Sequence, residues 1–152
     1  MNFLKSYNCL IEIYNKQISF FKNYLSDLLL LSIRVWIGLI FLKASLVKIA
    51  DFDTQIILFT YEYAIPFFSP TLMAFLATFF ELVCSILIFA GFLTRLSTLP
   101  FIAMTIVIQT LVIEHNDHFY WLFLLLTLTI YGAGRLSIDY LLTNLLKKND
   151  RK

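Results

Sequence analysis

The chain has 152 residues, of which 60% are hydrophobic and 14% are charged, whereas an ordinary soluble domain carries about 25% charged residues. This composition predicts an integral membrane protein, for which the lipid bilayer is the first partner. The length allows one domain of a few spans, because each spanning helix needs roughly 20 apolar residues. A net charge of +2 is too small to indicate a nucleic-acid partner.

Residues 1–26 carry apolar side chains at helical spacing, separated by lysines and other polar residues. This pattern predicts an amphipathic helix at the membrane interface. A signal peptide would need a compact apolar region followed by a small-residue cleavage site, and the polar residues of Cys9–Lys16 interrupt any such run. We therefore expect this segment to be retained. The apolar positions are Leu4, Tyr7, Leu10, Ile11, Tyr14, Ile18, Phe21 and Leu25.

Residues 27–136 contain apolar stretches long enough to form a transmembrane domain, and residues 137–152 form an amphipathic, basic C-terminal tail. The predicted fold class is an all-α membrane protein, a four-transmembrane-helix bundle with amphipathic N- and C-terminal helices. The segment between the first two spans is too polar to cross a bilayer. The spans are expected at about 27–47, 71–91, 95–113 and 119–135.

Several residues indicate where helices begin and end. Asp53 is expected to cap a short helix through Tyr63, and Gly91 suits the left-handed position that ends the second span. Thr94 is expected to cap the third span. Ser137 or Asp139 can cap the helix that follows the last span.

The distribution of basic residues predicts the orientation of the chain. In a four-span arrangement, most lysines and arginines outside the spans fall on one side, and Lys48 falls on the other with Lys43 near the border. Because basic residues concentrate on the cytoplasmic side, both termini are expected to be cytoplasmic.

Two ionisable residues, Arg34 and Glu81, lie inside predicted spans, where a charge is costly and usually marks a functional site. Counted along the helices, they lie roughly 10 and 15 Å from the cytoplasmic boundary, so we predict that they pair. Three interpretations remain open: a clamp between helices, a polar pocket for a small ligand or quinone headgroup, and a proton relay.

The remaining polar candidates lie toward the outer side. Lys43 and Lys48 can extend their ammonium groups to the headgroups, and Gln109 is the most deeply placed polar residue of the third span. The ligand or polar-pocket candidates are therefore Arg34, Glu81, Lys43 and Gln109. His115 and His118 lie in a polar connector, where a solvated loop or a ligand role at the outer mouth is expected in preference to a metal site.

Cys9 and Cys84 are the only cysteines, and they form no CxxC motif. A dithiol redox centre within the chain is therefore not expected. No catalytic residue, metal or resident cofactor is predicted from the residues, apart from a bound quinone as a candidate.

Over about Leu31 to Leu141 the chain resembles the DoxX family of small four-helix membrane proteins. The matching features are Arg34 with Gly38, Lys48 before an aspartate-containing stretch, Glu81, the turn Gly91–Arg95, and the terminal Gly132–Asp139. The resemblance implies a bacterial inner-membrane subunit of a redox system, linked to quinones or thiols.

Within such a system the chain would be at most a membrane subunit of an oxidoreductase complex. A redox partner protein and an oligomer are the expected protein partners. A small transporter or proton-coupled carrier, and a scaffold without chemistry, are the alternatives.

Overall fold

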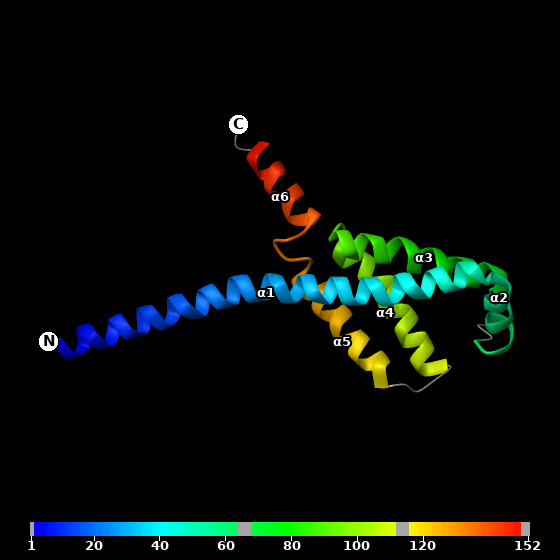
Figure 1. Ribbon diagram of the computed structural model, residues 1–152, viewed down its shortest axis with the longest axis horizontal. Coiled ribbons are helices and arrows are strands. Elements are labelled where there is room, and N and C mark those ends of the chain that lie inside the picture. Colours follow the sequence, from blue (N-terminus) through cyan, green and yellow to red (C-terminus); the bar gives the residue numbers. More distant parts are fainter. Residues whose placement is uncertain (1, 64–67, 112–115, 150–152) are drawn as a thin grey trace.

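The computed structural model describes the backbone of residues 2–63, 68–111 and 116–149 (Figure 1). Within these ranges the chain is helical and contains no strand, which agrees with the predicted all-α class. The helices are α1 (Asn2–Ala50), α2 (Phe52–Tyr61), α3 (Pro70–Ala90), α4 (Thr94–Leu111), α5 (Asn116–Tyr131) and α6 (Ile138–Asn149).

Helix α1 is a single helix of 49 residues that runs unbroken through the expected boundary between residues 26 and 27 (Figure 1). The sequence explains this continuity, because no glycine or proline precedes Gly38, and sharp bends in helices almost always occur at such residues. In the first half of α1 the described side chains, residues 11–22 and 24–26, are exposed, and the second half packs into the bundle. α1 therefore joins the predicted N-terminal segment and first span in one rod.

The bundle is formed by the second half of α1 together with α3, α4 and α5, in which α1 packs on α3, α3 on α4, and α4 on α5. Its core contains a stacked pair, Phe41 and Phe101, whose ring centroids lie 3.9 Å apart. Gly38 brings α1 close to α3, because a Cβ built there would lie 3.4 Å from the Ser85 carbonyl oxygen. The other fully buried apolar side chains are Ile37, Ala74, Ile88, Leu125 and Leu128.

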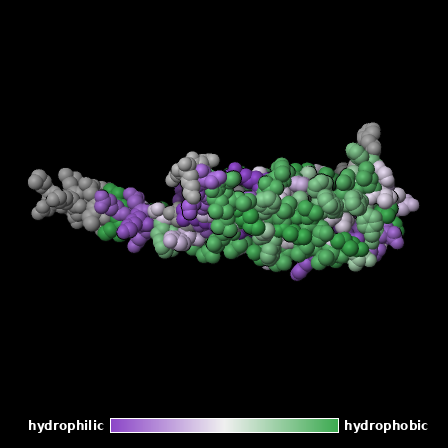
Figure 2. Space-filling view, turned by 90° about the horizontal axis from the view of Figure 1, so that it is seen from above, coloured by the Kyte–Doolittle hydropathy of each residue, from purple (hydrophilic) through white to green (hydrophobic). Residues whose placement is uncertain are grey.

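Among the residues that the structure describes, two helices are long and apolar enough to cross a membrane, judged by length and composition: Ile11–Ala50 within α1, and α3. Helix α5 has 16 residues, so its length along the axis is about 24 Å, compared with about 30 Å for the hydrocarbon core of a bilayer. Figure 2 shows that the face of the molecule seen there is apolar over the bundle, with hydrophilic residues near both ends. This distribution is typical of a protein surrounded by lipid.

The helix ends confirm one predicted cap and correct another. Gly91 ends α3 in the left-handed conformation, with φ of 69°, as the sequence predicted. Helix α2 is capped by Asp51 and not by Asp53, because the Asp51 carboxylate accepts hydrogen bonds from the Thr54 backbone N–H (3.2 Å) and hydroxyl (2.6 Å). Asp51 lies immediately before the first helical residue, where a side-chain oxygen can reach the N–H groups of the first turn. α2 ends at Tyr61, two residues before the predicted end.

Candidate functional site: a cavity beside a buried ion pair

Glu81 forms an ion pair with Lys48, in which Lys48 Nζ donates to Glu81 Oε1. The predicted pair between Arg34 and Glu81 is therefore wrong. Glu81 is 3% exposed, and its partner comes from the last turn of α1. The buried carboxylate in α3 is thus compensated by a lysine that the sequence interpretation placed at the headgroups.

The direction of the side chains explains why Glu81 pairs with Lys48 and not with Arg34. α1 and α3 are antiparallel, since Lys48 meets Glu81 whereas Arg34 meets Gly91. Side chains on a helix lean toward its N-terminus, so Arg34 leans toward the Gly91 end of the bundle and Glu81 leans away from it. Lys48 leans back from the far end of α1 and meets Glu81. The depths expected from about 1.5 Å rise per residue apply to the backbone and do not include the direction in which the side chains lean.

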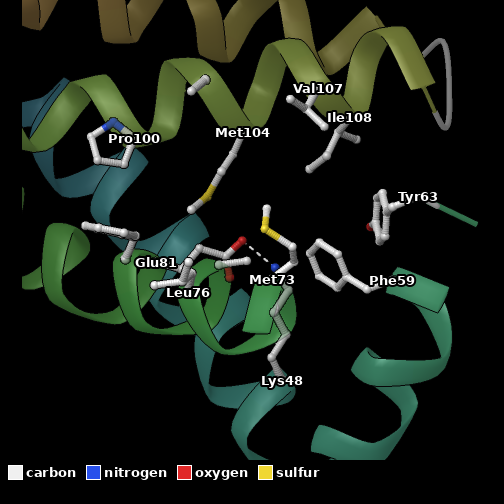
Figure 3. Close-up of a pocket in the computed structure, with 13 residues that line it drawn as sticks. Lys48, Phe59, Tyr63, Met73, Leu76, Glu81, Pro100, Met104, Val107 and Ile108 are labelled. Carbon is white, nitrogen blue, oxygen red and sulfur yellow. Dashed lines mark hydrogen bonds and ion pairs between the residues drawn. The ribbon is translucent and has the colours of Figure 1, made fainter. Parts of the chain in front are cut away.

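The ion pair lies on the wall of a cavity of about 410 Å³ between α3 and α4, with residues of α2 and the turn after it at one end (Figure 3). Ligand pockets in proteins are typically about 300–1,000 Å³ and mostly apolar with a few polar groups. This cavity has that character. Its lining consists of Lys48, Phe59, Tyr63, Met73, Leu76, Ala77, Phe80, Glu81, Pro100, Ala103, Met104, Val107 and Ile108.

One oxygen of the ion pair remains available. Glu81 Oε2 is buried and has no hydrogen-bond partner within the described part of the chain. A buried polar atom without a partner costs roughly 1–3 kcal/mol, and in native structures such atoms are explained by a functional role, by strain, or by a bound water or ion. The carboxylate can therefore accept a hydrogen bond from a ligand while it stays paired with Lys48.

Tyr63 adds a second polar group at the end of the cavity near α2 (Figure 3). Burial raises the pKa of its phenol, and the carboxylates of Glu62 and Glu81 raise it further. The phenol consequently keeps its proton at neutral pH. It can donate a hydrogen bond or accept one.

Arg34 lies in a different place, at the junction where α1, the α3–α4 turn and the α5–α6 linker meet. It is 1% exposed, and its Nη2 donates to the carbonyl oxygen of Leu136. Its guanidinium occupies the space beside Gly91, where an added Cβ would overlap it. Nε and Nη1 of Arg34 have no hydrogen-bond partner in the described ranges. We call this region the Arg34 junction.

The Arg34 junction is fastened by Asp139, whose role differs from the predicted one. Its carboxylate accepts hydrogen bonds from the backbone N–H groups of Leu93 (2.8 Å) and Thr94 (3.1 Å), so Asp139 caps α4 and the prediction that Thr94 does so is wrong. Thr94 is the first residue of the helix, one position too late to cap it. Ser137 caps α6, since its hydroxyl accepts from the Tyr140 N–H at 3.2 Å.

A second contact ties the linker to the first helix. Asp27 accepts a hydrogen bond from the Arg135 backbone N–H at 2.9 Å and lies 3.7 Å from its guanidinium. Together with the bond from the Asp139 N–H to the Gly91 carbonyl (2.9 Å), this contact holds the start of α6 against the bundle.

The other predicted residues do not join the cavity. Lys43 is exposed, and Gln109 lies elsewhere, where its Oε1 is 2.8 Å from His118 Nδ1. His115 lies outside the described residues. Of the four pocket candidates, only Glu81 lines the cavity. Over the part of the chain that the structure describes, no group of three or more potential metal ligands comes together.

Lys48 and Tyr63 are the site residues that sequence reasoning missed. Lys48 lies seven residues, about two helical turns, after buried Phe41, so the helical period placed it on the bundle-facing side. Its position near a span end favoured the headgroup interpretation instead. No local signal marks Tyr63, because its place depends on how α2 folds back over the bundle.

Over the described residues, helices without strands, two of them long and apolar enough to span a bilayer, and a buried carboxylate paired with a lysine among them are the features of an α-helical membrane protein. The family model described as DoxX matches residues 29–114, which is more than half of the chain. The protein belongs to the DoxX family. No curated protein and no solved structure matches it.

Proposed function

We propose that this DoxX-family protein is a quinone-binding subunit of a redox system in the bacterial inner membrane. The observation that carries the proposal is the pair between half-buried Lys48 and buried Glu81 on the wall of an apolar cavity, with one carboxylate oxygen left without a partner among the described residues. A quinone joins a polar ring to an apolar tail. The cavity offers the same combination of polar and apolar contacts.

The arrangement of helices supports four spans with both termini cytoplasmic. α1, α3, α4 and α5 pack side by side, and the basic residues Lys22, Arg95 and Arg135 lie at the end of the bundle where α1 enters and α4 begins. Arg95 donates to the Ile130 carbonyl oxygen at that end (3.2 Å). A concentration of basic residues at one end is typical of the cytoplasmic side.

The chemistry of the cavity fits a quinone ring. Lys48 Nζ can donate a hydrogen bond to a ring carbonyl oxygen, and Glu81 Oε2 can accept one from a quinol hydroxyl. Met73 and Met104 extend flexible thioethers into the cavity (Figure 3), and such groups adapt to and contact aromatic rings. A quinone takes up two electrons and a quinol releases them. The redox centre of a partner protein would donate or accept these electrons.

The test is binding of quinone to the purified full-length protein. Wild-type protein in mild detergent should retain extractable quinone and should bind a short-chain quinone in titration. We expect Lys48→Met and Glu81→Gln each to weaken binding about tenfold or more, because each removes a charge-assisted hydrogen bond worth roughly 1.5–3 kcal/mol.

Lys43→Met is the matched control, since Lys43 is an exposed lysine on the same helix and does not line the cavity. It should bind quinone as the wild type does. Folded wild-type protein that contains no quinone and binds none would overturn the proposal, as would equal binding by all three variants.

A further inference from the structure

The first half of α1 carries a seven-residue repeat of apolar residues. Counted in heptads, the a positions are Leu4, Ile11, Ile18 and Leu25, and the d positions are Tyr7, Tyr14, Phe21 and Leu28. Apolar a and d positions sustained over three to four heptads are one of the marks of a coiled coil. We infer that this segment pairs with the same segment of a second copy of the chain, as a parallel coiled coil at the cytoplasmic end of the bundle.

The a and d positions of this repeat form a stripe, here called the seam, and the seam residues that the structure describes are exposed within one chain. Figure 1 shows the segment projecting beyond the bundle. The described seam residues Ile11, Tyr14, Ile18, Phe21 and Leu25 are 39% to 64% exposed, although each is apolar. An apolar stripe of this length on a helix requires a partner or a lipid surface.

The seam faces away from the protein's own bundle. Buried Leu30, Arg34 and Ile37 each follow a seam residue by nine residues, which is two and a half turns of a helix. The bundle-packing face and the seam are therefore on opposite sides of α1. A second copy can approach the seam without disturbing α3, α5 or α6.

The membrane fixes the direction of pairing. Two copies inserted with the same orientation present their α1 helices parallel, which matches the geometry in which like positions of a heptad meet. The charged residues Glu12 and Lys16 lie outside the seam, so they do not oppose close approach.

A lipid surface is the competing occupant, and the backbone disfavours it. To lie on the headgroups, the segment would have to bend sharply where it leaves the bundle near Asp27. No glycine or proline is present before Gly38, and α1 is continuous there. Four heptads extend instead about 42 Å along the helix axis.

Cysteine crosslinking of the full-length protein in membranes tests the inference. In a background with Cys9→Ser and Cys84→Ala, single variants Ile18→Cys (an a position) and Phe21→Cys (a d position) are oxidised. Both should give a product of twice the monomer mass. Lys16→Cys and Ser19→Cys, on the opposite side of the same helix turns, are matched controls and should remain monomeric.

A spin label at residue 18 gives a second readout that does not depend on disulfide formation. Dipolar broadening that disappears on dilution with unlabelled protein would support a pair of copies. A label accessible to lipid-dissolved oxygen without broadening, equal crosslinking at all four positions, or crosslinks only to a different protein would each overturn the inference. The result is independent of quinone binding, because the seam and the cavity share no residue.

Discussion

The Lys48–Glu81 cavity and the Arg34 junction both bury charged groups, yet their surroundings differ. At the cavity, a lysine and a carboxylate neutralise each other beside about 410 Å³ of space. At the junction, a guanidinium fills the space beside a glycine and bonds a backbone carbonyl. A buried charge beside a cavity can meet a ligand, whereas one enclosed by packed backbone holds helices together.

The difference also explains how each charge is tolerated. A charge inside a membrane protein must find a partner or polar contacts. Glu81 finds an opposite charge. Arg34 instead uses the Leu136 carbonyl and the nearby carboxylate of Asp139, which attracts it through space.

The largest expected effect comes from breaking the ion pair. Lys48→Met should destabilise the protein by about 3 kcal/mol, because it leaves Glu81 buried and uncompensated. Combining Lys48→Met with Glu81→Gln should recover most of the loss. Thermal unfolding of the single and double variants in detergent measures this, and additive losses would show that the two residues do not interact.

A smaller effect is expected at the junction from Gly91→Ala. The added Cβ would overlap the Arg34 guanidinium, and φ of 69° is unfavourable for alanine, so we expect a loss of about 2 kcal/mol. Gly38→Ala is the control, since its Cβ would make ordinary contacts at 3.4 Å. Unfolding can be followed by thiol labelling of buried Cys84 in a Cys9→Ser background. Equal melting temperatures for the two variants would contradict the packing described.

Removal of the cap of α4 should have a weaker effect. Asp139→Ala leaves the Leu93 and Thr94 N–H groups without their acceptor, for a loss of about 1 kcal/mol. Quinone binding at the cavity should be unchanged, because Asp139 does not line it. Exposed Asp53, which neither lines the cavity nor caps α2, provides the control variant Asp53→Ala. A loss of quinone binding in Asp139→Ala would show that the two regions are coupled.

The smallest effect concerns α2, which covers one end of the cavity. Hydrogen bonds from the Thr54 hydroxyl and N–H lower the pKa of Asp51. Its capping contribution is therefore present above the unfolded-state pKa and is lost as the pH falls through the lower folded-state pKa. Hydrogen exchange of α2 should accelerate on acidification in wild type. In Asp51→Asn that pH response should be absent, and an unchanged response would implicate another group.

Many of the helices and one helix end could be predicted from short stretches of sequence. The apolar runs predicted helices at α1, α3, α4 and α5, and Gly91 predicted the left-handed end of α3, because helical period and backbone conformation depend on neighbouring residues. The sequence also identified Arg34 and Glu81 as charges among apolar residues. These inferences need no knowledge of how helices are placed relative to one another.

Which side chains pair with one another depends on the tertiary structure. Glu81 bonds Lys48 instead of Arg34, and Asp139 caps a helix that begins 45 residues before it, because pairing depends on side-chain lean and on contacts distant in sequence. The cavity likewise depends on the packing of α2 against α3, which brings Phe59 and Tyr63 to the space between α3 and α4. The order of the residues specifies which side chains are charged, apolar or able to end a helix, and the packing of antiparallel helices specifies which of them meet.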